Sequence, residues 1–212
     1  MSLFTPPLGP VRPPAVRRLV GWLLVVLSVA GCGARRPPAA WQPSTAVEQQ
    51  LFSRSPPVPA DALSATVVRV VDGDTLLARL PGQPTVRVRV IGVDTPETVK
   101  PGTPVACFGA VASDYAKHLL TGLTVRAAYE PGGQTDRYGR DLWDVWLPDG
   151  RLLAGLLVAD GLGRAYPYEP QVRFAGLLAS LQAEARAAGR GLWGSPCHGR
   201  SFSTPDRAWH PP

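Results

Sequence analysis

The chain has 212 residues, with 22 Lys or Arg against 16 Asp or Glu, so its formal net charge at pH 7 is +6. This length accommodates one domain with a hydrophobic core. The charge fits a polyanionic partner but singles out none. No HExxH, Walker-type phosphate loop or GxSxG motif occurs in the sequence, which excludes the usual signatures of zinc peptidases, P-loop nucleotide hydrolases and serine hydrolases.

Residues 1–31 have the pattern of an export signal. Three arginines precede an apolar run over residues 19–30 that is too short to span a bilayer comfortably. The run ends in LSVAGC, which resembles the lipobox of bacterial lipoproteins and implies cleavage before Cys32 and acylation of that cysteine. We therefore expect an exported protein, lipid-anchored to the cell envelope at the outer membrane or cell surface. An ordinary secretory signal is the alternative, and without this segment the net charge falls to +3, from 19 basic and 16 acidic residues.

The two ends of the remaining chain have a different composition from its middle. Residues 32–61 are rich in Pro, Ala and Ser, so we expect the acylated Cys32 to be followed by a disordered tether. Residues 199–212 are predicted to form a loose C-terminal tail around an isolated tryptophan. The folded domain is therefore expected over residues 62–198.

Short runs of β-forming residues dominate the first half of this domain. Residues 65–71 and 75–80 flank the turn DGD and predict a hairpin. A third run, residues 85–93, alternates strictly, so that Val86, Val88 and Val90 lie on one face and Arg87 and Arg89 on the other. Two further strands are expected at residues 123–129 and 140–147.

Helical spacing occurs at residues 109–122, 151–161 and 171–188. The predicted order is thus three strands, a helix, two strands and two helices. Five short strands with an intervening helix suit a five-stranded Greek-key barrel of the OB type. We therefore predict an α+β fold, mainly β, with about three helices.

Two cysteines remain after Cys32 is set aside. In an exported protein, Cys107 and Cys197 are expected to form a disulfide. Two separate buried thiols are the alternative, because the distance between the cysteines is not visible in the sequence.

Four motifs point to a family. Their order and approximate spacing resemble the staphylococcal nuclease (thermonuclease) family over about residues 65–193. Each motif alone is weak, but four in register are specific. The motifs are VVDGDT (residues 70–75), VRVIGVDTPET (88–98), TDRYGR (135–140) and AYPYEP (165–170).

By that resemblance, Asp74 and Asp94 are the carboxylate ligands of one Ca²⁺ ion, and Thr95 contributes its backbone carbonyl. Hard oxygen ligands select a hard cation, and so few protein ligands leave positions for water and a phosphate oxygen. Asp72 is expected to lie just outside the ligands. Without Asp94, residues 72–74 would be better explained as an ordinary Asp-Gly hairpin turn.

Glu97 resembles the family glutamate that orients or deprotonates the attacking water, and a solvated loop glutamate is its alternative. Pro96 stiffens this corner by fixing its own φ and restricting the residue before it. Arg89 and Arg140 match the two family arginines that stabilise the charge developing on the phosphate. Arg87, on the same strand face as Arg89, is expected to be a solvated surface arginine.

Three tyrosines match residues that line the family's nucleotide pocket, where a hydroxyl can reach phosphate and a ring can pack on a base. They are Tyr138, Tyr166 and Tyr168. Ordinary half-buried tyrosines at the barrel edge are the alternative.

The resemblance implies a calcium-dependent, largely sequence-nonspecific endonuclease that hydrolyses phosphodiester bonds of DNA and RNA and leaves 3′-phosphate ends. We expect a monomer, attached to the membrane through Cys32. The alternative is a catalytically inactive OB barrel, which binds nucleic acid or contacts other envelope components without cutting. Binding without metal dependence would distinguish this alternative from the enzyme.

Overall fold

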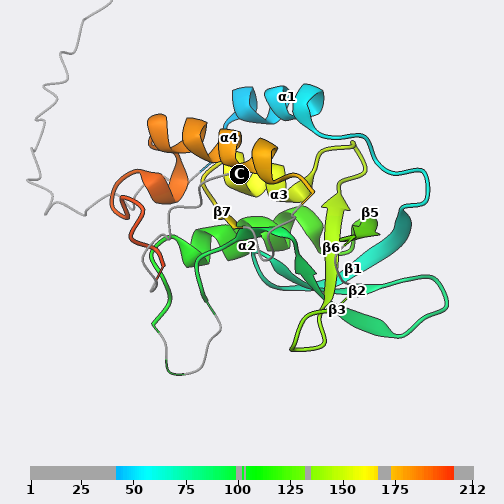
Figure 1. Cartoon of the computed structure of the whole chain (residues 1–212). Coiled ribbons are helices and arrows are strands. Elements are labelled where there is room, and N and C mark those ends of the chain that lie inside the picture. The colour runs from blue at the N-terminus through cyan, green and yellow to red at the C-terminus, as the bar shows by residue number, and fades with distance from the viewer. Residues whose placement is uncertain (1–41, 99–101, 103, 132–134, 167–172, 203–212) are drawn as a thin grey trace, which may run out of the picture. The chain divides into compact units, whose positions relative to one another are not determined.

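The computed structural model describes residues 42–98, 102, 104–131, 135–166 and 173–202 (Figure 1). The predicted export signal, Cys32 and Tyr168 lie outside these residues. Within the described ranges, no helix has the length and apolar character needed to cross a membrane. The helices are α1 (Thr45–Arg54), α2 (Gly109–Leu120), α3 (Leu153–Ala159), α4 (Ala175–Ala187) and the 3₁₀ helix η1 (Gly191–Trp193), and the strands are β1 (Leu63–Asp72), β2 (Thr75–Arg79), β3 (Thr85–Val90), β4 (Gly92–Asp94), β5 (Thr124–Tyr129), β6 (Asp141–Trp146) and β7 (Arg164–Tyr166).

Five strands close into a barrel in the order β1-β2-β3-β6-β5. The first three form an antiparallel meander, β3 then pairs in parallel with β6, and β5 closes the barrel against β1. Residues 142–146 of β6 are all buried, because this strand is covered on both faces, and Trp143 and Trp146 are its largest buried side chains. The predicted five-stranded OB-type barrel is confirmed.

The third predicted strand is interrupted after Val90. Gly92 has a φ of 82°, a conformation that glycine adopts without a steric cost, and the chain changes direction there. The following strand, β4, leaves the barrel and pairs antiparallel with β7, with Asp94 opposite Arg164. This departure carries Asp94 and the residues after it to the outside of the barrel wall.

The helices cover one side of the barrel. Every residue of α3 is buried, which agrees with its position between the barrel and the outer helices α1 and α4 (Figure 1). Helix α2 packs against β1. The three predicted helices are present, and α1 is an additional one.

The disordered tether predicted over residues 32–61 is wrong for the part that forms helix α1, Thr45–Arg54. Val47 and Leu51 are buried, with 6% and 1% of their surface exposed. Nη1 of Arg54 donates to both carboxylate oxygens of Glu184 on α4, at 2.9 Å each. The composition misled the prediction because only two apolar side chains, one helical turn apart, attach this helix to the core. The folded region therefore begins before residue 62.

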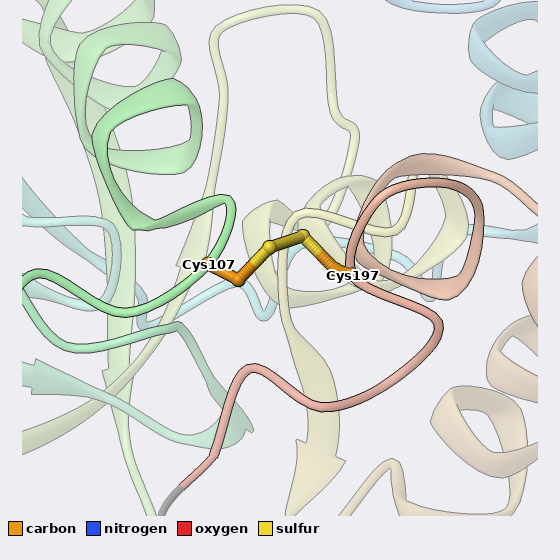
Figure 2. Close-up of a disulfide and its surroundings, with 2 residues drawn as sticks. All are labelled: Cys107 and Cys197. Atoms are coloured by element: carbon orange, nitrogen blue, oxygen red, sulfur yellow. A yellow bond between two sulfur atoms is a disulfide. The ribbon is translucent and has the colours of Figure 1, made fainter.

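A disulfide joins Cys107, which precedes α2, to Cys197, which follows η1 (Figure 2). The predicted pairing is thus present in the structure, and the two Cα atoms lie 5.7 Å apart. The chain beyond Cys197 also departs from the loose tail that was predicted from residue 199. Ser201 is buried and Phe202 is half-buried, so the tail stays packed at least as far as residue 202.

Candidate active site

One pocket of about 280 Å³ lies where the β1–β2 turn, the β4 corner and β7 meet. Seven of the nine predicted metal, catalytic and substrate-binding residues line it, as does Asp72, so the barrel brings together motifs that are far apart in the sequence. The lining residues are the carboxylates Asp72, Asp74, Asp94 and Glu97, the arginines Arg89, Arg140 and Arg164, and Thr75, Thr95 and Tyr166.

Asp74 links the β1–β2 turn to the β4 corner. Its Oδ2 accepts hydrogen bonds from the backbone nitrogen and the hydroxyl of Thr95, at 2.8 and 3.1 Å. Oδ1 accepts from the hydroxyl of Thr75 at 3.1 Å. Gly73 makes this approach possible, because a Cβ at that position would lie 2.6 Å from the Thr95 methyl carbon.

Arg89 is buried at the base of the pocket, with 3% of its surface exposed. Its Nη1 donates to the carbonyls of Val90 and Val93 at 3.0 and 2.8 Å, and lies 3.1 Å from Oδ2 of Asp74. Its Nη2 lies 3.6 Å from Oδ1 of Asp94. A buried guanidinium needs such partners, and in return it fixes the corner and offsets the negative charge of both aspartates.

Asp94 is held mainly by Arg164. Nε and Nη2 of that arginine both lie 2.9 Å from Oδ2 of Asp94. Burial and the neighbouring Asp74 raise the pKa of Asp94, and the two arginines, Arg89 and Arg164, oppose this rise. Sequence reasoning missed Arg164, although its position immediately before the fourth motif could have indicated it.

Asp72 supplies an unsatisfied carboxylate beside the pocket. Its Oδ1 is buried and has no hydrogen-bond partner among the described residues. Burial and the charge of Asp74 raise the pKa of Asp72 to about 7. Such an orphaned oxygen next to two further aspartates fits a hard cation, which would offset the crowded negative charge. The described part of the chain contains no cluster of three His, Cys, Asp or Glu side chains able to hold a metal ion, so Asp74 and Asp94 would need the carbonyl of Thr95 and outside ligands.

Arg140 reaches the pocket from the turn before β6. Its Nε and Nη2 each lie 2.7 Å from Oδ2 of Asp136, and its Nη1 lies 3.5 Å from the hydroxyl of Thr75. Asp136 also accepts hydrogen bonds from the backbone nitrogens of Tyr138 and Arg140. Burial alone would raise the pKa of Asp136, but the bonds from Arg140 and Tyr138 bring it below its ordinary value. Asp136 is the second residue of the site that sequence reasoning missed. It could have been found in the motif TDRYGR, because an aspartate at the start of a turn commonly accepts hydrogen bonds from the backbone of that turn.

Glu97 lines the pocket and is half-buried. Its Oε1 accepts a hydrogen bond from the backbone nitrogen of Thr98 at 3.0 Å, and its backbone carbonyl accepts one from the backbone nitrogen of Ala106, next to the disulfide.

Of the predicted tyrosines, Tyr166 lines the pocket and is 40% exposed. Tyr138 does not line it, and its ring lies in solvent against Arg140, 5.5 Å from the guanidinium carbon.

The pocket can therefore hold a phosphate between cationic groups while a carboxylate faces it. Arg87, by contrast, is exposed and is not among the residues that line the pocket, as predicted. The site combines the groups that phosphoryl-transfer chemistry uses, namely charge-stabilising arginines and oxygen ligands for a metal.

Comparison with known proteins identifies the family of this chain. Residues 87–195 match the family model described as "Staphylococcal nuclease homologue". The chain is 44% identical over 130 residues to a thermonuclease of Staphylococcus intermedius, an alignment that covers 61% of this chain and 76% of the relative. It is 38% identical over 143 residues to an uncharacterized endonuclease of Escherichia coli, covering 68% and 85%. To the SPbeta prophage-derived endonuclease YokF of Bacillus subtilis it is 33% identical over 134 residues, covering 63% and 45%. The chain therefore belongs to the staphylococcal nuclease family, and its relatives support a nuclease activity.

Proposed function

We propose that this protein is a calcium-dependent endonuclease that hydrolyses DNA and RNA with little sequence preference and leaves 3′-phosphate ends. The observation that carries the proposal is the single pocket in which three arginines surround Asp74, Asp94 and Glu97. A protein that only binds nucleic acid does not need paired carboxylates facing the phosphate, because carboxylates repel it.

The cation is proposed to bind Asp74, Asp94 and the carbonyl of Thr95. When bound, Ca²⁺ polarises the phosphate and holds it near the attacking water. Thr95 and Thr75 already hold the Asp74 carboxylate in one orientation, so little side-chain entropy remains to be lost on binding.

The protein's own groups supply the remaining chemistry. Glu97 is placed on a corner stiffened by Pro96, where it can orient the attacking water or accept its proton. Asp136 holds Nε and Nη2 of Arg140, so that Nη1 is presented beside Thr75 within the pocket. We propose that Arg140 and Arg89 both donate to the phosphate oxygens as their charge increases, as the family resemblance implies. The buried Arg89 also stabilises the corner and offsets its charge.

The weak sequence preference is supported by what surrounds the pocket. Its lining consists mainly of charged groups suited to a phosphate, which every nucleotide carries. The rings of Tyr138 and Tyr166 are the exposed aromatic surfaces nearest these groups, and stacking on a ring accepts any base. The 3′-phosphate product and the use of both DNA and RNA rest on the family resemblance.

We further propose that a lipid on Cys32 attaches a monomeric enzyme to the cell envelope, on the basis of LSVAGC at residues 27–32. Labelling cells with a radioactive fatty acid tests this attachment. Cys32→Ser should abolish both the incorporation of label and the recovery of the protein in the membrane fraction. Label retained by this variant would contradict the anchor.

The catalytic proposal is tested by fluorescence-monitored cleavage of labelled single-stranded DNA. The full-length protein in detergent would be assayed with calcium, with magnesium and with a chelator. We expect cleavage that needs calcium and that falls by about 100-fold or more in Glu97→Gln and in Arg140→Ala. Arg87→Ala is the matched control, because it removes an exposed arginine two residues from Arg89, and its activity should remain within about twofold of the wild type.

Unchanged cleavage in both site variants would refute these residue roles. Metal-independent binding without cleavage under any condition would instead favour the non-catalytic barrel.

A further inference from the structure

Arg164 is held against Asp94 by the pairing of two strands. The two residues are opposite each other in the antiparallel β4–β7 pair, so the sheet register itself brings their side chains together. Both Nε and Nη2 approach the same oxygen, Oδ2 of Asp94, at 2.9 Å. Only 6% of the surface of Arg164 is exposed, so water screens this ion pair weakly.

The C-terminal segment covers the other side of this arginine. The ring centre of Phe202 lies 4.0 Å from the guanidinium carbon of Arg164, and that of Tyr166 lies 5.1 Å from it. A planar guanidinium can accept both kinds of contact, because its edge donates to a carboxylate while its face stacks on a ring. Phe202 follows the buried Ser201, and the disulfide at Cys197 ties this segment to the chain just before α2.

This arrangement opposes a cation at Asp94. The guanidinium of Arg164 already binds Oδ2 of Asp94, and Nη2 of Arg89 lies 3.6 Å from Oδ1 of the same carboxylate. A divalent ion on Asp94 would be repelled by the nearby guanidinium of Arg164 unless that group moved away. Phe202 restricts such a movement, because its ring packs on the guanidinium face at 4.0 Å.

We propose that Arg164, held in place by Phe202, is a positioning residue that weakens calcium binding at Asp94, so that the C-terminal segment sets the calcium concentration at which the site fills. The inference rests on the proposed function, because it requires a calcium ion at Asp74 and Asp94. It adds to that function two residues outside the predicted site and a role for the packed tail.

Isothermal titration of the full-length protein with calcium chloride, without substrate, tests the inference independently of cleavage. Arg164→Gln should bind calcium about tenfold more tightly than the wild type, because it removes the positive charge that competes with the ion for Asp94. Arg164→Lys keeps the positive charge but not the two-point contact with Asp94, so the calcium affinity of this variant should lie between those of the wild type and Arg164→Gln. Phe202→Ala should bind more tightly by a smaller factor, and it should have no further effect in the Arg164→Gln background.

Two matched controls remove the same groups elsewhere. Arg186 lies over the ring of Trp193 at 4.2 Å, and Arg151 lies over the exposed ring of Phe52 at 5.0 Å. Neither contact involves the pocket, so Arg186→Gln and Phe52→Ala should leave the calcium dissociation constant at its wild-type value. Circular dichroism would verify that each variant folds. If Arg164→Gln does not fold, the two single variants Arg164→Lys and Phe202→Ala still decide the test.

Unchanged or weaker calcium binding in Arg164→Gln, with normal binding by the wild type, would overturn this inference alone. No calcium binding by the wild type would overturn it together with the proposed metal dependence.

Discussion

At the residue scale, Gly73 shows how one missing side chain shapes the site. It separates Asp72 from Asp74, and its Cα faces Thr95 so closely that no Cβ fits between them. The hydrogen bonds from Thr95 to Asp74 depend on this approach, because both are formed across the same contact. The glycine is therefore a requirement of the proposed metal site, because of this close approach.

We predict that Gly73→Ala lowers calcium affinity and cleavage by about tenfold, because Thr95 must move away from Asp74. Calcium titration and the DNA cleavage assay would measure the two effects. Gly176→Ala is the control, since a Cβ at Gly176 meets nothing within 4 Å. Wild-type calcium affinity in Gly73→Ala would show that the contact with Thr95 does not matter.

At the scale of secondary-structure elements, α1 belongs to the folded domain. Its Leu51 is 1% exposed and reaches toward Gly155 of α3, where a Cβ would lie 3.7 Å from the Leu51 Cδ2 atom. Nη1 of Arg151 lies 3.4 Å from Glu48 of the same helix, which adds a polar contact at its edge. The helix thus packs on α3, which in turn contacts β4 and β7, the strands that carry Asp94 and Arg164.

We predict that Leu51→Ala lowers the free energy of unfolding by about 2–5 kcal/mol, because it leaves a cavity under α1. Urea unfolding in the presence of a chelator would measure it without a contribution from bound metal. Gln49→Ala changes an exposed residue of the same helix and should shift stability by about 0.5 kcal/mol or less. Equal stabilities of the two variants would mean that α1 does not contribute to the core.

At the scale of the whole molecule, the disulfide closes a long loop. Cys107 and Cys197 are 90 residues apart, and the loop between them includes β5, β6, β7 and helices α2 to α4. In the chain-entropy model, such a cross-link stabilises the folded state by roughly 4 kcal/mol. It also connects the segment after Glu97 with the one that contains Phe202.

Replacing both cysteines by serine should therefore lower the free energy of unfolding by roughly 4 kcal/mol. Urea unfolding of the variant and of the oxidised wild type would measure the difference. The reduced wild type serves as the control and should unfold close to the variant. If reduction and replacement both left the unfolding midpoint unchanged, the pairing would have no role in stability.

The stability of the molecule should also depend on pH through Asp144. This residue of β6 is 2% exposed, and burial together with the nearby Glu130 raises its pKa to about 7, against the opposing effect of Arg173. An acid with a raised pKa in the folded state contributes stability below its unfolded pKa, near 3.8, and this contribution is lost as the pH rises to about 7.

We predict that Asp144→Asn is more stable than the wild type at pH 8 and that this advantage shrinks toward pH 4. Thermal unfolding with a chelator at several pH values would follow it. Asp114→Asn, in which the original side chain is 68% exposed, should keep the wild-type pH dependence. An advantage of Asp144→Asn that grows as the pH falls would contradict the sign of this linkage.

Much of the fold and of the site follows from the sequence. Alternating apolar residues identified the barrel strands, because a period of two reports directly which side of a strand is buried. The motifs identified Asp74, Asp94, Glu97 and Arg140, which the structure places in or around one pocket. These features are visible in the sequence because each depends on residues close together in the chain.

Tertiary structure alone decided which distant groups meet. Asp94 contacts Arg164 only because β4 leaves the barrel at Gly92 and pairs with β7. The contact of Phe202 with that arginine likewise exists because the C-terminal segment packs back onto the domain. Helix α1 is held by two apolar side chains, too few to produce a periodic signal, and its burial depends on α3 and α4. Local patterns specify the elements, whereas contacts between residues far apart in the chain exist only after those elements have packed.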